Sequence, residues 1–574
     1  MQLLSMTNVY SKNSNLFLLL VLVYTIPLFS FKNKETTDCQ FPMKQNLIKY
    51  LDNNLLNDTN VLKNATPNII LILADDMGYS DLGCYGGEIN TPNLNKLAAN
   101  GLRFSQFYNG ARCCPTRATL LTGLYAHQTG IGSMVGPSQP GSPGYAGDLN
   151  KNCITIGEVL KNSGYETFMA GKWHISQSTD TSDIHNWPLQ RGFDKFYGII
   201  TGAGSYYNPG TLTYNNTPAK ISDDYYFTDA ISDSMASFIT SHTMKNPFFG
   251  YLAFTAPHWP LHAPENDVKK YYGKFSNGWD TLREQRLTRM QKIGLIDSGV
   301  KLSERDVNVI DWNSVEDKKN EERKMEVYAA MIERMDIGIG KVLQSLENSD
   351  QLNNTIIIFL SDNGACAEFL GKDMNWVKEY GPTTTKEGKK VIYGNDAGVL
   401  PGGDDSYQSY GIGWANLSNT PFKLYKHYIQ EGGIATPLII NWPNGIPTKM
   451  NGSILTNVSH IIDIMPTLID LTSTIYPKIY NGSLIYPLEG ESFAKLIMGD
   501  NSWEKKKPTF WEHEKNSGMR DGDWKITKIF NNDWELFNLK NDRIEQNNLS
   551  KKYSKRYKSM IYNWNLWAKR VFVN

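Results

Sequence analysis

Two pairs of oxygen-bearing side chains follow two short apolar segments of this chain. They are Asp75 with Asp76, and Asp362 with Asn363. Carboxylate and amide oxygens are the ligands that hard cations such as calcium and magnesium prefer. Either pair alone would be interpreted as a turn or a helix cap, and only their joint placement favours a metal site. Cysteine and histidine are not clustered with them at zinc-like spacing, so zinc is not expected.

Basic side chains follow two further apolar segments in the same way. Lys172 and His174 come after the run 167–170, and His258 comes after the run 248–254. An isolated histidine is more often structural, and a single lysine is usually a solvated charge. In a parallel sheet, however, ligands bind outside the carboxyl ends of the strands. We therefore expect these residues and the acidic pairs to meet at one edge of a sheet.

Residues 113–117 read Cys-Cys-Pro-Thr-Arg, and a helical pattern follows them. Pro115 suits the first turn of a helix, so Cys113 is expected where free backbone N–H groups and the helix dipole favour an anion. Arg117, one turn on, is suited to binding charged oxygens. From the residues alone, Cys113 remains open to other interpretations: a buried apolar residue, half of a disulfide (one with Cys114 included) or a simple thiolate nucleophile.

The elements that must position these residues alternate along the chain. Short apolar runs typical of buried strands lie at 68–74, 167–170, 248–254, 355–360 and 437–440, and helical patterns lie at 91–100, 155–163, 229–241 and 321–345. This alternation predicts an α/β fold with a large, mostly parallel or mixed sheet sandwiched by helices.

Two long segments interrupt this pattern, and the character of the chain changes near its end. The segments 267–317 and 365–416 are expected to be surface excursions, of the kind that build substrate pockets. Beyond about residue 490, the runs 508–513, 524–530 and 534–538 resemble short antiparallel strands, and 551–573 resembles a closing helix. We therefore predict a catalytic α/β domain over 67–490 and a smaller C-terminal α+β subdomain over 491–574.

The N-terminus predicts export to the periplasm or secretion. A lysine and an apolar run interrupted by proline indicate a signal peptide over 1–31, followed by a polar lead-in over 32–66, with an uncleaved anchor as the alternative. No stable membrane insertion is expected after cleavage. Lys plus Arg and Asp plus Glu both number 58, so net charge favours neither nucleic acid nor anionic membranes as partners. The six cysteines do not form a disulfide framework, and no bridge is assigned.

The motif at 113–117, followed by Thr122-Gly123, resembles the signature of the type I, formylglycine-dependent sulfatases of the alkaline-phosphatase-like superfamily. The resemblance covers most of the chain from about residue 68. It continues through the motifs Ala-Asp-Asp-Met-Gly at 74–78, Gly-Lys-Trp-His at 171–174, Ala-Pro-His-Trp-Pro at 256–260, Ser-Asp-Asn-Gly at 361–364 and Glu-Gly-Gly at 431–433, which occur in the family's order.

This resemblance implies a role for each matched residue. Cys113 matches the cysteine that a separate maturation enzyme oxidises to formylglycine (3-oxoalanine), whose hydrate is the nucleophile. Asp75, Asp76, Asp362 and Asn363, with residue 113, match the positions that bind one Ca²⁺ per chain. Arg117 and Lys172 match residues that stabilise the modified side chain and the sulfate, His174 matches the residue assisting sulfate release, and His258 with Lys426 matches the pair facing the leaving group.

The resemblance leaves several assignments open. Lys423 lies one helical turn from Lys426 and is the alternative sulfate-binding lysine, and His513 is either a pocket residue or a packing residue. Rival functions are a formylglycine-dependent phosphonate or phosphodiester hydrolase, and a non-catalytic protein that binds sulfated glycans. The expected substrate is a sulfated polysaccharide, an oligosaccharide or an aryl sulfate. Aromatic residues in predicted loops are candidates for stacking on its ring, although such residues more often serve packing: Tyr206, Tyr207, Trp259, Tyr393, Tyr407 and Trp414.

Overall fold

The computed structural model describes residues 66–574 apart from 137–141, 244, 372, 374–379 and 396–397. Thr66–Asn574 forms one compact unit. The predicted signal peptide and, apart from Thr66, the polar lead-in lie outside the described residues. Within the described residues, no helix has both the length and the apolar character that crossing a membrane requires.

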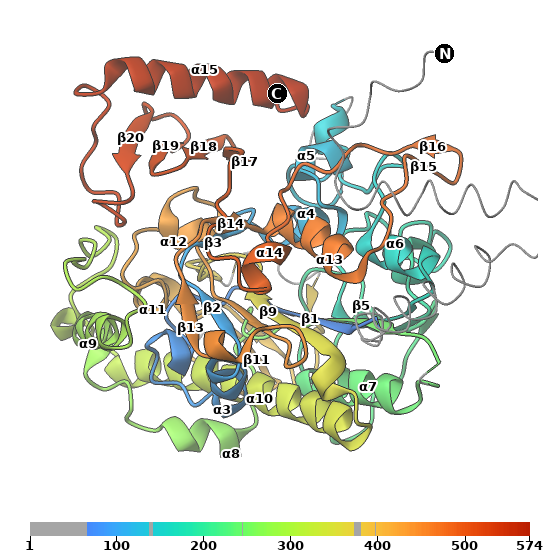
Figure 1. Ribbon diagram of the computed structural model, residues 1–574. Coiled ribbons are helices and arrows are strands. Elements are labelled where there is room, and N and C mark those ends of the chain that lie inside the picture. The colour runs from blue at the N-terminus through green and yellow to red at the C-terminus, as the bar shows by residue number, and fades with distance from the viewer. Residues whose placement is uncertain (1–65, 137–141, 244, 372, 374–379, 396–397) are drawn as a thin grey trace, which may run out of the picture. The chain divides into compact units, whose positions relative to one another are not determined.

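A ten-stranded mixed sheet forms the centre of this unit (Figure 1). In spatial order its strands are β13 (Ser453–Leu455), β2 (Leu102–Phe104), β12 (Leu438–Asn441), β9 (Thr355–Ser361), β1 (Asn68–Ala74), β8 (Phe248–Ala253), β4 (Glu166–Lys172), β5 (Lys195–Ile199), β6 (Leu212–Tyr214) and β7 (Thr217–Pro218). The strands from β9 to β5 are mutually parallel, whereas β12 pairs antiparallel with both β9 and β2. The predicted α/β sheet is therefore confirmed.

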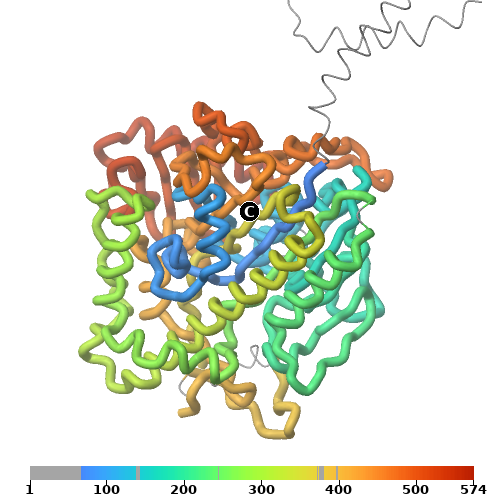
Figure 2. The backbone as a smooth tube through the Cα atoms, turned by 60° about the horizontal axis from the view of Figure 1, so that its bottom comes forward, coloured from blue at the N-terminus to red at the C-terminus, as the bar shows by residue number. Residues whose placement is uncertain are grey.

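Helices cover both faces of the sheet. One core contains side chains of α3 (Pro92–Ala99), α7 (Phe227–Thr240) and α10 (Lys318–Asn348), and the other contains side chains of α4 (Cys113–Thr122), α6 (Ile156–Asn162) and α13 (Ile464–Thr472). Along β1, Ile70 and Ile72 enter the first core, while Ile69 and Leu71 enter the second. Burial on both faces explains why this strand is apolar throughout rather than alternating. Figure 2 shows α10 running across one face.

The two excursions contain more structure than their sequences predict. The segment 267–317 includes the end of α8 (Glu265–Val268) and all of α9 (Gly278–Lys292), although its periodicity is weak. Arg286 of α9 is buried, and it forms ion pairs with Asp81 and Glu88 at 2.7 Å each. A buried arginine removes the apolar signal that marks a packed helix face, which explains the missed helix. The segment 365–416 holds β10 (Ile392–Tyr393), β11 (Ser406–Tyr407) and the start of α11 (Gly411–Ser418).

The C-terminal region forms a four-stranded antiparallel sheet of β17 (Thr509–His513), β18 (Asn516–Asp521), β19 (Trp524–Lys528) and β20 (Glu535–Asn538), followed by α15 (Ser554–Arg570) (Figure 1). The sequence prediction missed β18. Its residues, Asn-Ser-Gly-Met-Arg-Asp, lack the β-branched and aromatic side chains that mark strands. The domain boundary at residue 490 stays a prediction.

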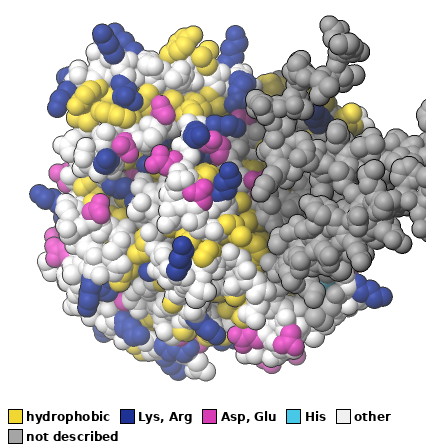
Figure 3. All heavy atoms as spheres, in the orientation of Figure 1, with side chains coloured by type: hydrophobic (Ala, Val, Ile, Leu, Met, Phe, Trp, Pro, Cys, Tyr) yellow, Lys and Arg dark blue, Asp and Glu magenta, His cyan; other side chains and the backbone are white. Residues whose placement is uncertain are grey.

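Several short elements complete the described chain: β3 (Phe107–Tyr108), β14 (Ser459–His460), β15 (Ile479–Tyr480), β16 (Ser483–Leu484), α5 (Ala126–Thr129), α12 (Glu431–Ile434) and α14 (Ala494–Ile497). On the face shown in Figure 3, basic and acidic side chains are interspersed. The mixture gives this face no single dominant charge, so any attraction for ions of one sign must come from a small group of residues.

Candidate active site

Strand register brings the first acidic pair beside the second. In the parallel pair β1 and β9, Ala74 lies opposite Ser361, so both strands end at the same level. The backbone N–H of Asp362 donates to Ala74 O at 3.1 Å. Asp75 and Asp362 therefore emerge side by side at the carboxyl edge of the sheet, as the sequence predicts.

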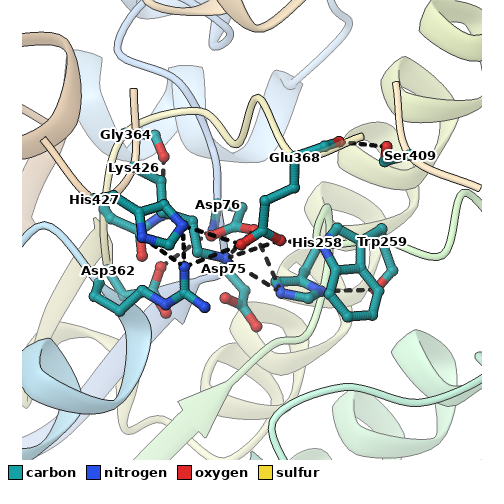
Figure 4. Close-up of polar contacts among 12 residues, drawn as sticks. Asp75, Asp76, His258, Trp259, Asp362, Gly364, Glu368, Ser409, Lys426 and His427 are labelled. Atoms are coloured by element: carbon teal, nitrogen blue, oxygen red, sulfur yellow. Dashed lines mark hydrogen bonds and ion pairs between the residues drawn. The ribbon is translucent and has the colours of Figure 1, made fainter. Parts of the chain in front are cut away.

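The four predicted metal-binding side chains lie close together and are buried. The backbone N–H of Asp76 donates to Asp362 Oδ1 at 3.1 Å, and Asn363 Nδ2 donates to Asp76 Oδ1 at 2.6 Å. Figure 4 shows Asp75, Asp76 and Asp362 gathered at this edge. Asp75 Oδ1 and Asn363 Oδ1 have no hydrogen-bond partner. Because buried polar atoms are rarely left unsatisfied, these two oxygens fit ligands of a cation.

Two cations approach Asp75 from other elements. Lys172, the last residue of β4, places Nζ at 2.5 Å from Asp75 Oδ2. Arg117, on the second turn of α4, lies between two carboxylates: Nη2 is 2.9 Å from Asp362 Oδ2 and 3.5 Å from Asp75 Oδ2. Burial raises the pKa of Asp75, and burial together with the nearby Asp75 raises that of Asp362 well above its ordinary value. The site therefore crowds carboxylates that additional positive charge would stabilise.

Backbone geometry before Lys172 leaves no room for a side chain. Gly171 has φ of +116°, and a Cβ there would lie 1.8 Å from Ala253 O of the neighbouring strand β8. Asp76 and His174 also adopt positive φ, at 63° and 55°. Such conformations persist only where the surrounding structure imposes them, and they cluster at functional sites.

Cys113 is the first residue of α4 and is buried. A hydrogen bond from Cys114 and the nearby Lys172 ammonium lower the pKa of the Cys113 thiol well below its ordinary value, against the effect of burial. His174 lies beside these thiols, with Nε2 at 3.6 Å from Cys114 Sγ. A Cβ at Gly202 would meet the His174 ring at 2.2 Å, so glycine leaves room for that ring. Residue 113 therefore lies at a helix start that favours negative charge, and His174 is close to it.

His258 and Lys426 form a pair beside Asp76. Lys426 Nζ lies 2.8 Å from Asp76 Oδ2 and 3.4 Å from His258 Nε2. His258 Nδ1 lies 2.7 Å from Trp259 O. Since a carbonyl only accepts, Nδ1 carries the proton, and neutral His258 presents the lone pair of Nε2 toward Lys426. Burial lowers the pKa of His258 to about 4, while Asp76 overcomes burial and raises that of Lys426 well above its ordinary value.

The two candidate sulfate-binding lysines, Lys423 and Lys426, have different partners in the structure. Lys423 Nζ donates to Glu545 O at 2.6 Å, in the C-terminal region. Lys426 Nζ reaches the acidic cluster instead. His513 is fully buried, and its ring centroid lies 5.9 Å from that of His427.

A pocket opens outward from Cys113, His174, His258 and Lys426, and sequence analysis missed most of its remaining lining. The remaining lining residues are Arg112, Met134, Gly202, Ala203, Trp259, Glu368 and Tyr380. Of these, Trp259 alone was among the aromatic residues suggested for stacking. The only sequence feature that could have pointed to Arg112 is its position next to the motif cysteine. For Glu368 it is its position in the second excursion, 365–416.

The other suggested aromatic residues belong to packed clusters. Tyr206, Tyr407 and Trp414 are at most 1% exposed and are therefore not available for stacking on a substrate. Trp414 packs at 5.2 Å from Trp279 within the first core. Tyr393 stacks on Tyr407 at 4.7 Å, and Tyr207 packs against Tyr226 at 5.4 Å.

The five cysteines in the described residues do not pair with one another. Cys84, Cys113, Cys114, Cys153 and Cys366 are all free thiols. Cys113 and Cys114 therefore do not form the vicinal disulfide that sequence left open.

Fold and site together define an alkaline-phosphatase-like hydrolase, and comparison with known proteins gives its family. The sulfatase family model matches residues 67–475, and the model "N-sulphoglucosamine sulphohydrolase, C-terminal" matches residues 422–566. The chain belongs to the sulfatase family and is a sulfuric ester hydrolase.

Individual relatives support this membership. An uncharacterized sulfatase of Schizosaccharomyces pombe is 32% identical over 87% of this chain and 92% of its own length. An arylsulfatase of Klebsiella aerogenes is 34% identical over 75% of this chain and 92% of its own length. Among solved structures, Ps i-CgsB matches with a TM-score of 0.62 and 25% identity, covering 88% of this chain and 93% of that one.

Proposed function

We propose that this protein hydrolyses the sulfate ester of a carbohydrate or an aryl alcohol, using one Ca²⁺ and a formylglycine made from Cys113. One observation carries the proposal: two buried oxygens, Asp75 Oδ1 and Asn363 Oδ1, lack hydrogen-bond partners in the cluster next to Cys113. A donor set of carboxylate and amide oxygens suits calcium. Asp75, Asp76, Asp362 and Asn363, with residue 113, would hold the ion.

Each absent group supplies chemistry that the side chains cannot. Calcium, held by these oxygen ligands, would supply positive charge that offsets the negative charge of a sulfate ester. Formylglycine, as its hydrate, would supply two hydroxyls on one carbon: a nucleophile for sulfur and the second hydroxyl that turnover requires. The position of Cys113 at the start of α4, with Arg117 one turn on, suits the negative charge of that reaction.

The protein's own residues bind the sulfate and move protons. Arg117, Lys172 and Lys426 would stabilise the negative charge on the sulfate oxygens. His174 accepts a proton at residue 113. The pair of His258 and Lys426 delivers a proton to the departing oxygen, because sulfate bound beside His258 Nε2 favours the protonated ring.

The leaving group is proposed to be a sugar of a sulfated polysaccharide or oligosaccharide, or a phenol. The relatives named above include an arylsulfatase, and a 25% identical relative from Bacteroides thetaiotaomicron is an N-acetylglucosamine-6-O-sulfatase. We further propose an exported protein, periplasmic or secreted, that depends on a formylglycine-generating enzyme for maturation.

Peptide mass spectrometry tests the modification directly. Conversion of the Cys113 thiol to an aldehyde lowers the mass of its peptide by about 18 Da. The Cys113→Ala variant should lose turnover while keeping its melting temperature, and Cys114→Ser should still undergo conversion. A fully active protein with unmodified Cys113 would exclude the nucleophile assignment.

A substrate comparison separates the sulfatase from its rival on the same fold. The mature protein should hydrolyse 4-nitrophenyl sulfate faster than the matching phosphate diester and phosphonate ester. Faster hydrolysis of the phosphorus esters would favour the phosphonate or phosphodiester hydrolase.

A further inference from the structure

A carboxylate, Glu368, lines the pocket on the side away from the acidic cluster. Figure 4 shows it between His427 and the pair His258 and Trp259. Its Oε1 lies 3.0 Å from Arg112 Nη1 and 3.1 Å from His427 Nε2. Trp259 Nε1 donates to its Oε2 at 2.7 Å. Three partners therefore hold a charged group at a fixed place in the pocket wall.

The Glu368 carboxyl is ionised and remains reachable. Burial alone would raise its pKa, but Lys426 and Arg112 hold it well below its ordinary value. The side chain is 20% exposed, and each carboxylate oxygen can accept more than one hydrogen bond. A hydroxyl of a molecule in the pocket therefore has an acceptor available.

A second carboxylate, that of Glu514, contacts the other ring nitrogen of His427. Glu514 Oε2 lies 2.9 Å from His427 Nδ1, and the Glu514 side chain is 45% exposed. Glu514 and Lys515 form the turn between β17 and β18 with φ of 49° and 68°. Neither residue is a glycine or an asparagine, which such turns prefer, so the acidic residue is held at the hairpin tip at some conformational cost.

The cations that line this pocket are already engaged. Among the described lining residues they are Arg112, paired with Glu368, and Lys426, which lies 2.8 Å from Asp76 and 4.0 Å from Glu368. On the hairpin, Lys515 Nζ lies over the Phe530 ring at 4.8 Å. Glu368 and Glu514 are thus two carboxylates that contact the two ring nitrogens of His427, and each cation that lines the described part of the pocket already has a carboxylate partner. A second anionic group on a substrate would have to compete with those carboxylates.

We propose that Glu368 and Glu514 select sulfate esters whose leaving group carries no negative charge of its own, and that Glu368 accepts a hydrogen bond from a hydroxyl of that group. This inference rests on the proposed function and narrows its substrate class to uncharged sugars and phenols. Uronic acids and sugars bearing a second sulfate are disfavoured.

A matched pair of esters tests the selection: 3-carbamoylphenyl sulfate and 3-carboxyphenyl sulfate, which differ by one negative charge at similar size. Mature wild-type protein should give a kcat/KM about tenfold higher for the carbamoyl ester, a size expected for uncompensated like charges at a partly buried site. The ratio of the two kcat/KM values should fall toward one in Glu368→Gln and in Glu514→Gln. It should also fall with rising salt.

A distant variant controls for net charge. Glu347 lies near the end of α10 and pairs with Lys96 at 3.6 Å, so Glu347→Gln removes the same charge elsewhere and should leave the ratio unchanged. Equal kcat/KM values for the two esters in wild type would overturn the inference and leave the sulfatase intact. A ratio unchanged in both Glu368→Gln and Glu514→Gln would overturn it as well. If the mature protein hydrolyses neither ester, the proposed function fails and the inference fails with it.

Discussion

Lys426 Nζ donates to Asp76 Oδ2 at 2.8 Å, although 350 residues separate them in the sequence. The contact is buried, and it places the lysine beside both the acidic cluster and His258. The nearby Lys423 points instead to the C-terminal region, where Nζ meets Glu545 O. Because the two lysines contact different parts of the structure, substitution of each one should have a different effect on catalysis.

Replacing Lys426 should affect catalysis, and replacing Lys423 should not. We expect Lys426→Ala to reduce kcat/KM for an aryl sulfate by roughly 10²–10³-fold, the usual loss for one charge-stabilising group in an active site. Lys423→Ala should remain within a few-fold of wild type. Steady-state kinetics of both variants decides the assignment, and the reverse pattern would move the sulfate-binding role to Lys423.

Removing calcium should lower both stability and activity. After dialysis against a chelator, added Ca²⁺ should raise the melting temperature, by an amount equivalent to about 2.7 kcal/mol at one hundred times the dissociation constant. Asn363→Ala should raise the Ca²⁺ concentration needed, because it removes one oxygen ligand. Asn348→Ala, at the exposed end of α10, is the matched control. A melting temperature that does not respond to Ca²⁺ would exclude the metal site.

Glycine at 171 should be required for steric reasons. Gly171→Ala combines a positive φ with a Cβ placed 1.8 Å from Ala253 O, so we expect a loss of roughly 2–4 kcal/mol in the free energy of unfolding. Gly164→Ala has a similar φ of +89° but nothing within 4 Å, and should cost only about 1–2 kcal/mol. Denaturant unfolding of the two variants measures the difference. Equal losses would mean that the approach of β8 is not limiting.

A buried charge cluster should make stability depend on pH. Glu431 of α12 pairs with Lys525 of β19 at 2.8 Å and with Arg543 at 3.2 Å, which ties the C-terminal sheet to the central unit. Burial opposes ionisation of Glu431, but Lys525 and Arg543 lower its pKa from 4.5 to about 2. Its contribution to stability is therefore complete above pH 4.5 and is lost as the pH falls from 4.5 toward 2.

The Glu431→Gln variant tests this dependence. At neutral pH it should destabilise the protein by about 3–5 kcal/mol, because Lys525 and Arg543 lose a buried partner. The difference from wild type should shrink below pH 4.5, where the wild-type carboxyl also becomes neutral. Thermal unfolding of both proteins across that range provides the measurement. A difference that does not change with pH would exclude the ion pair as its source.

Sequence alone determined the features that depend on local pattern. The run 68–74 coincides with β1 because a strand buried on both faces must be apolar at every position. The meeting of the acidic pairs follows from strand ends, because parallel strands bring their carboxyl ends to one edge. The helix that begins at the motif 113–117 follows from its proline in the first turn. The predicted residues Asp75, Asp362, Arg117 and Lys172 do meet at that edge.

Only the tertiary structure decided features that depend on the path of the chain. It placed Lys426 rather than Lys423 at Asp76 and buried Trp414 in a core. It also brought Arg112 and Glu368 from distant segments to one pocket, with Glu514 joined to Glu368 through His427. These contacts join residues whose neighbours in sequence carry no periodic or motif signal. Their positions follow from how loops and the C-terminal hairpin pack on the sheet, which is a property of the whole fold.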